Sequence, residues 1–341
     1  MVSYSYYISL PHIHLVESAN AKKLIELEVN GRKAEVVKAS NDDQEALTKA
    51  FNGAEGIYAT SLYNVDMKKK FDPENKEELE CGRAMIEAAK STSTTLKYFL
   101  FQTMHRFKTH PTDIGLPVPV HYMTKYALEE ENKNTELPWI FLRQAGYMRQ
   151  VRFLLKGSTQ MSSFHPPENK VGFVEEEDIG KLVASILAPK DESIITVGQT
   201  INAITVLATP PELAKRSAVV IPGFSPDFKQ TSPTYSKYLF KALACFVGGP
   251  IFPYVGAISE NFGFGNALDM DESDLEKCQS MTAEFGGLTT YEEWLEKYMT
   301  EEPHGDKRDV SMQTKFQETN RSQNGSKSSP LLAQIKQLLT Y

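Results

Sequence analysis

The sequence has little cysteine and no excess of positive charge, and each shortage excludes a class of function. Only three cysteines occur among 341 residues, and none is spaced as a metal-binding pair. An odd number of cysteines argues against a disulfide framework and for a reducing compartment. The formal net charge is -7, so direct binding of nucleic acid through a basic face is not expected. No histidine pair has metal-site spacing either, so no metal is predicted.

We expect neither a secretory signal nor a membrane-spanning helix from this sequence. No basic segment followed by an apolar stretch opens it, so we expect a location in the cytoplasm or the nucleus. Residues 242–259 carry no charge and are nearly long enough to cross a bilayer. Gly248, Gly249, Pro250 and Pro253 interrupt them, and the broken backbone would face lipid. We interpret the segment as buried or ligand-facing and expect no membrane partner.

The sequence does contain an alternation of strand and helix patterns through its first 150 residues. Asn41 is the expected cap of the second helix, and Asn52–Gly53 is its expected stop. Helical stretches between strands imply parallel pairing, and near-continuous apolar strands fit a sheet covered on both faces. The fold class is therefore α/β with a doubly wound parallel sheet. The predicted strands cover 13–18, 33–40, 56–63, 96–103 and 138–148, and the predicted helices cover 20–28, 41–51, 73–90 and 119–134.

From about residue 151 the pattern becomes less regular. A strand followed by a helix is predicted for 171–188 and a further strand for 194–201. A closing helix is predicted for 289–299, capped by Thr289 or Thr290. After Glu302 the composition turns polar, which predicts a disordered tail.

Six segments, taken in their order along the chain, resemble the NmrA-like family of atypical short-chain dehydrogenases. The resemblance covers about residues 12–300. Its segments are KAEVVKASNDDQEALTKAFNGAEGIYATSLY (33–63), EELECGRAMIEAAK with LKYFLFQT (77–103), HYMTKYALEE (121–130), PWIFLRQAGYM (138–148), VEEEDIGKLVASILA (174–188) and LTTYEEWLEKY (288–298).

This resemblance implies a Rossmann-like NAD(P)-binding domain with a smaller α+β domain on the substrate side. We expect the first in residues 1–150 with 171–205 contributing to it, the second in 151–300, and a polar tail in 301–341. The family also implies a dinucleotide, commonly NADP, held by a Gly-x-x-Gly-x-x-Gly loop after the first strand. Its members include redox or nitrogen regulators and true reductases.

The start of the chain departs from the family pattern. MVSYSYYISLPH (1–12) stands where the first strand, glycine loop and first helix are expected, and the first glycine is Gly31. Such a loop lets the backbone approach a pyrophosphate at a helix N-terminus. Gly263 and Gly265 do not replace it, because no strand precedes them. We therefore expect an N-terminally truncated Rossmann-like domain in which binding of NADP or NAD is weak or lost. Three explanations of the missing glycine loop remain open. The sequence could be a fragment, the protein could be a degenerate family member without a dinucleotide, or the remaining half of the cleft could bind a dinucleotide weakly.

The segment HYMTKYALEE carries the candidate catalytic residues. Short-chain dehydrogenases place Tyr-x-x-x-Lys on one helix face, where the lysine holds the nicotinamide ribose and lowers the pKa of the tyrosine. Here His121 stands four residues before Lys125, and Tyr122 stands three before it. The resemblance implies Lys125 as a ribose contact and His121 or Tyr122 as a proton donor, although His121 could instead cap the helix or pack. The further candidate cofactor contacts are Thr60, Ser61, Thr103, Gly146 and Tyr147.

Two functions fit these observations. The first is a regulatory or sensor protein of redox or nitrogen metabolism, with impaired dinucleotide binding and a protein partner. The alternative is an NAD(P)H-dependent oxidoreductase of a small apolar carbonyl or alkene. Its substrate would then be enclosed by residues 240–254, Tyr147 and Met148. A scaffold without any ligand is a third possibility.

Overall fold

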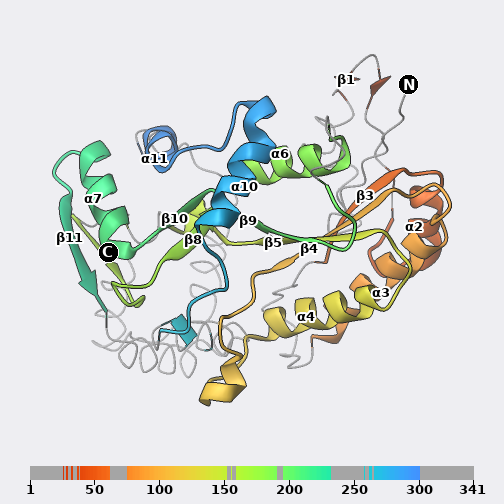
Figure 1. The fold of residues 1–341 in the computed structure, drawn as a ribbon, viewed down its shortest axis with the longest axis horizontal. Coiled ribbons are helices and arrows are strands. Elements are labelled where there is room, and N and C mark those ends of the chain that lie inside the picture. Colours follow the sequence, from red (N-terminus) through yellow and green to blue (C-terminus); the bar gives the residue numbers. More distant parts are fainter. Residues whose placement is uncertain are drawn as a thin grey trace, which may run out of the picture.

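The computed structural model describes residues 39–61, 75–151, 159–189, 195–231 and 265–299, with a few single positions or pairs outside these ranges (Figure 1). The predictions for residues 13–18, for most of 242–259 and for the tail after Glu302 lie outside the described residues. Two short strands, β1 (Glu28–Val29) and β2 (Arg32–Lys33), form an antiparallel pair. None of the described helices has the length and hydrophobicity that a bilayer crossing requires.

A four-stranded parallel sheet forms the centre of the described fold. Its strands lie in the spatial order β3-β4-β5-β9. Long apolar runs in β4 and β5 place buried side chains on both faces of the sheet, as parallel sheets require. The strands are β3 (Gly56–Thr60), β4 (Tyr98–Met104), β5 (Trp139–Gln144) and β9 (Thr200–Ala203).

Helices cover both faces of this sheet (Figure 1). Phe99, Phe101 and Phe141 pack in one core with residues of α2 (Gln44–Phe51), α3 (Lys76–Lys90) and α4 (Val120–Lys133). Leu100, Ile140 and Leu142 pack in a second core with residues of α6 (Glu176–Leu187) and α10 (Glu272–Thr282). The alternation of strand side chains between faces explains this division. The predicted α/β fold with a covered parallel sheet is confirmed.

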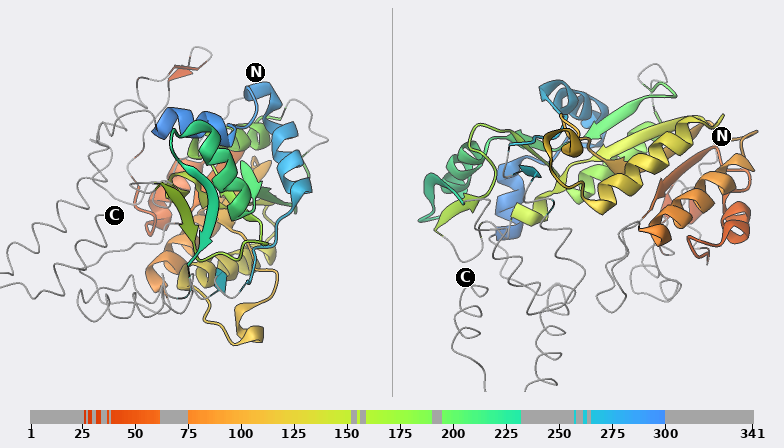
Figure 2. Two further views of the ribbon diagram at one scale, coloured as in Figure 1. Left: turned by 90° about the vertical axis from the view of Figure 1, so that its left-hand side faces the viewer. Right: turned by 90° about the horizontal axis from the view of Figure 1, so that it is seen from below.

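A second group of short strands carries its own core, which Figure 2 shows from two further sides. Three strands pair in the order β10-β8-β6, and β7 pairs with β11 in parallel. Tyr291 and Trp294 are the largest side chains in this core, and both are fully buried. The elements are β6 (Gly146–Tyr147), η3 (Met148–Gln150), β7 (Gln160–Ser163), β8 (Val171–Val174), β10 (Val206–Ala208), α7 (Pro210–Val220), β11 (Ser225–Gln230), η5 (Ala283–Phe285) and α11 (Tyr291–Met299).

The structure corrects three predicted strands. The single strand expected for 138–148 ends at Gln144, and after Ala145 the chain enters the second sheet as β6. The strand expected from residue 194 begins only at Thr200, because Gly198 makes a turn with a φ of +84°. Of the strand expected for 33–40, Lys33 lies in β2, and the described residues 37, 39 and 40 lie outside strands.

The helix caps are also clarified. The helix expected from Asn41 begins at Gln44, so the capping side chain is Asp43, which accepts a hydrogen bond from the Ala46 amide at 3.0 Å. At the last helix, the Thr290 hydroxyl accepts from the Glu293 amide at 3.2 Å. Thr290 is therefore the cap, while Thr289 bonds elsewhere.

Candidate functional site

The carboxyl ends of the parallel strands gather most of the predicted site residues at one edge of the sheet. β3 ends at Thr60 and is followed by Ser61, and Gln102 and Thr103 lie close to the end of β4. Thr60 stands opposite Gln102 in the strand register. Ligands of open α/β sheets bind outside these strand ends. The predicted residues thus share the edge at which this class of fold places its ligands.

Lys125 reaches this edge from α4 and is held entirely by protein groups. Its ammonium donates to the backbone oxygen of Ser61, and it donates to the Ser61 hydroxyl at 2.8 Å. Its nitrogen also lies 2.9 Å from Oε1 of Glu78. An ammonium has three hydrogens, and these three acceptors occupy them. A ribose could contact Lys125 only by displacing one of these acceptors.

Glu78 is a residue of this candidate site that the sequence interpretation missed. Its side chain on α3 is fully buried, and it also accepts hydrogen bonds from Ser61 and Asn75. Asn75 precedes the helix in a left-handed conformation (φ 48°) and donates to Thr124 as well. The signal was present in the pattern, because Glu78 shares its helix face with buried Gly82 and Met85. A carboxylate on an apolar face requires a buried partner.

Thr103 belongs to a second buried network beside the first. Its hydroxyl donates to Glu129 at 2.5 Å, and the guanidinium of Arg143 donates two hydrogen bonds, of 2.9 and 2.7 Å, to the same carboxylate. Arg106 adds a contact of 2.9 Å. Burial acts to raise the pKa of Glu129, but its bonds to Arg143, Thr103 and Arg106 outweigh burial and hold the pKa below its usual range. The hydroxyl of Thr103 is therefore engaged by a carboxylate that itself forms structural ion pairs with Arg143 and Arg106.

His121 and Tyr122 lie in the first turn of α4 and are both buried. Burial, together with the charge of Lys125, lowers the pKa of His121 to about 3. At neutral pH this imidazole is therefore uncharged and lacks the second ring proton that an imidazolium could donate. The ring of Tyr122 packs against Phe107, His121 and Tyr126, with centroid distances of 5.0, 4.6 and 6.0 Å. The surroundings of both side chains are those of core residues.

Gly146 and Tyr147 reach the same region through β6. The Tyr147 hydroxyl donates to Gln144 at 3.2 Å, next to the end of β5. Met148, expected to line a substrate site, is instead fully buried in the core of the second group of strands, with Tyr291 and Trp294. Residues 240–254 lie outside the described residues. The part of the chain that the structure describes contains no group of three or more metal-binding side chains.

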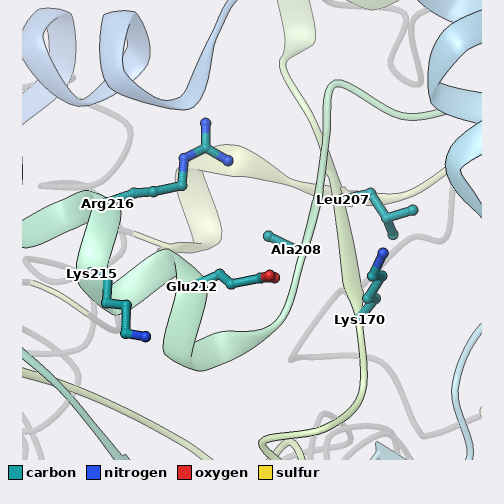
Figure 3. Close-up of a pocket in the computed structure, with 6 residues that line it drawn as sticks. All are labelled: Lys170, Leu207, Ala208, Glu212, Lys215 and Arg216. Carbon is teal, nitrogen blue, oxygen red and sulfur yellow. The ribbon is translucent and has the colours of Figure 1, made fainter.

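A surface hollow of about 380 Å³ lies between β10 and α7, apart from this edge (Figure 3). Two of its charged side chains form ion pairs: Lys170 pairs with Glu272, and Arg216 pairs with Glu292 at 2.6 Å. Glu212 closes the capping box of α7 with Thr209. None of the predicted site residues lines the hollow, whose lining consists of Lys170, Leu207, Ala208, Glu212, Lys215 and Arg216.

Comparison with known proteins identifies the family. The NmrA-like family model matches residues 14–295. No curated protein matches the chain significantly in sequence.

Solved structures share the fold at low sequence identity. The negative transcriptional regulator Nmra has 13% identity and a TM-score of 0.62, with 84% of this chain and 85% of that chain covered. The NADPH-dependent quinone oxidoreductase QOR2 from Escherichia coli, complexed with NADPH, has 16% identity and a TM-score of 0.58, with coverage of 82% and 87%. The triphenylmethane reductase of Citrobacter sp., complexed with NADP(H), has 19% identity and a TM-score of 0.55, with coverage of 77% and 83%.

Proposed function

The chain belongs to the NmrA-like family, and on that premise we propose that it is a regulatory protein that binds NAD(P) weakly. In this proposal, a dinucleotide occupies the carboxyl edge of the parallel sheet, and a protein partner reads its presence. Neighbouring folds include a negative transcriptional regulator in complex with NAD, as well as reductases complexed with NADPH or NADP(H). They support a nicotinamide dinucleotide as the ligand.

The state of Lys125 is the observation that carries this proposal. A reductase of the short-chain type needs a free lysine to hold the ribose and a proton donor beside it. Here Ser61 and Glu78 accept the hydrogen bonds that the ammonium of Lys125 can donate. Burial lowers the pKa of His121, so its imidazole is uncharged at neutral pH. These features favour binding without hydride transfer. They also favour weak binding, since Lys125, engaged by Ser61 and the buried carboxylate of Glu78, adds no contact to the ribose.

The test measures binding and turnover on the same full-length chain. We expect NADH or NADPH to bind with a Kd of about 100 µM or weaker, and oxidation of NADPH by a panel of quinones, aldehydes and alkenes to stay at background. The double variant Glu78→Gln/Lys125→Met removes both charges of the buried pair at once, and dinucleotide affinity should stay within about twofold of the original. Lys49→Met, an exposed lysine of α2, is the matched control.

The oxidoreductase is the competing function, and the same experiment decides between the two. Turnover that Glu78→Gln/Lys125→Met abolishes and Lys49→Met retains would establish a reductase and overturn the regulatory proposal. Absence of any dinucleotide binding would favour a scaffold without a ligand. A dinucleotide that binds without turnover, and whose affinity does not depend on Lys125, would support the regulatory function.

A further inference from the structure

A chain of polar side chains crosses the carboxyl ends of three neighbouring strands on the sheet face opposite α4. Tyr58 of β3 donates to Gln102 of β4, and the amide of Gln102 donates to Gln144 of β5. The Tyr147 hydroxyl donates to the same Gln144 oxygen at 3.2 Å. Two residues earlier on β4 and β5, on the same face of the sheet, Leu100 and Leu142 pack in the apolar core with α6. The polar chain therefore begins where that core ends.

We propose that the side-chain amide of Gln144 donates a hydrogen bond to a carbonyl oxygen of a ligand at this edge. The inference rests on the proposed function, because it concerns a ligand of the same sheet edge. It identifies a recognition residue that the sequence interpretation did not single out.

The direction of the hydrogen bonds leads to this assignment. The oxygen of Gln144 already accepts from Gln102 and Tyr147. Among the described residues, its amide nitrogen has only the sulfur of Met104, at 3.9 Å, as a partner, and a thioether is a weak acceptor. A primary amide carries two hydrogens. Gln144 is half-buried, so its amide offers a donor that the described protein does not satisfy with an oxygen.

The neighbours of Gln144 hold its amide in this orientation. Burial raises the pKa of both Tyr58 and Tyr147, so both hydroxyls stay protonated and remain donors at neutral pH. The guanidinium of Arg149 lies 5.1 Å from the centre of the Tyr147 ring, which restrains that ring. Arg149 is itself held by Glu176 at 2.8 Å. Because Tyr147 donates, the oxygen of Gln144 faces it, and the nitrogen faces away.

A neutral donor at this position fits an uncharged acceptor. A carbonyl oxygen satisfies it without bringing a charge into a half-buried site, whereas a phosphate would be matched better by a cation. Two sources supply such an oxygen at a dinucleotide site: the carboxamide of the nicotinamide and the carbonyl of a reducible substrate such as a quinone. Both would meet the same amide.

The experiment uses the full-length chain and the variant Gln144→Glu. A glutamate has the same length and still accepts from Gln102 and Tyr147, but as a carboxylate it cannot donate. Gln144→Met removes the donor without adding a charge. Gln279→Glu makes the same substitution on the exposed side of α10 and serves as the control. Titration calorimetry measures binding of NADH and of ADP-ribose, which lacks the nicotinamide. Titration calorimetry with 1,4-benzoquinone measures binding of a quinone carbonyl.

The two arms distinguish the sources of the carbonyl. If the carboxamide is the acceptor, both Gln144 variants weaken NADH binding about tenfold, and ADP-ribose binding stays within twofold. If the carbonyl of a second ligand is the acceptor, NADH binding is unchanged and the affinity for 1,4-benzoquinone falls about tenfold. Neither change, in variants whose melting temperatures show that they fold, overturns the assignment. A wild-type chain that binds neither NADH nor ADP-ribose overturns the proposed function, and this inference with it.

Discussion

At the scale of single residues, Lys125 and Glu78 form a pair whose members depend on each other. Glu78 is fully buried, and the side chain of Lys125 is 9% exposed. Removing one partner leaves the other charge buried without compensation. We therefore expect Lys125→Met to lower the free energy of unfolding by about 3–5 kcal/mol, measured by urea denaturation. This loss should exceed any effect on dinucleotide affinity.

The double variant gives this prediction its control. Glu78→Gln/Lys125→Met replaces the pair by neutral groups of similar size, and such replacements are often close to neutral. It should recover most of the stability that Lys125→Met loses. If the single and double variants were equally unstable, the side-chain volume of Lys125 rather than its charge would be what the fold requires.

At the scale of elements, Asp178 in the first turn of α6 joins three segments that are distant in sequence. Its fully buried carboxylate accepts from the Thr289 amide at 2.9 Å and from the Thr205 hydroxyl at 3.1 Å. Lys181 of the same helix donates to it at 2.7 Å. Through these contacts, α6 holds the loop before β10 and the start of α11.

We expect Asp178→Ala to cost about 3 kcal/mol of unfolding free energy, because charge-assisted hydrogen bonds are lost and the Thr289 amide is left unsatisfied. Urea denaturation measures this loss, and limited proteolysis should show earlier cleavage near α11. Glu276→Ala, which changes an exposed carboxylate of α10, should alter neither. Equal stability of the two variants would contradict the role of Asp178 as a connecting residue.

The same elements mark how far the sequence alone could predict the fold and the site. The strands β3, β4 and β5 and the helices α3 and α4 were predictable, because apolar runs and amphipathic repeats are local patterns. The division of 138–148 between two sheets was not, since it depends on the pairing of β6 with β8, which is distant in sequence. The place of Lys125 on a helix was predictable, but its pairing with Glu78 depends on the packing of α3 against α4, and its role as a ribose contact stays a prediction. Likewise, Gln144 gains its role from residues on three other strands.

At the scale of the whole molecule, three histidines with lowered pKa values make stability depend on pH. Burial is the largest cause that lowers the pKa of His105 and of His121, each to about 3, and it lowers the pKa of His165 to about 4. In the unfolded chain a histidine titrates near 6.5. Below that pH the unfolded state takes up protons that the folded state does not, so stability falls as the pH falls. Each histidine should cost about 2 kcal/mol between pH 6.5 and pH 5.

The pH dependence of the urea midpoint measures this effect. In the window from pH 6.5 to 5, carboxylates with ordinary or lowered pKa values stay ionised in both states, so the slope reports mainly the buried histidines. His105→Gln replaces a titrating ring by a neutral group, and the number of protons taken up on unfolding should fall by about one. His110→Gln, an exposed histidine near η2 (Pro111–Ile114), should leave the slope unchanged. An unchanged slope in His105→Gln would mean that the folded protein protonates this imidazole, and that water reaches the edge of the sheet between β4 and β9.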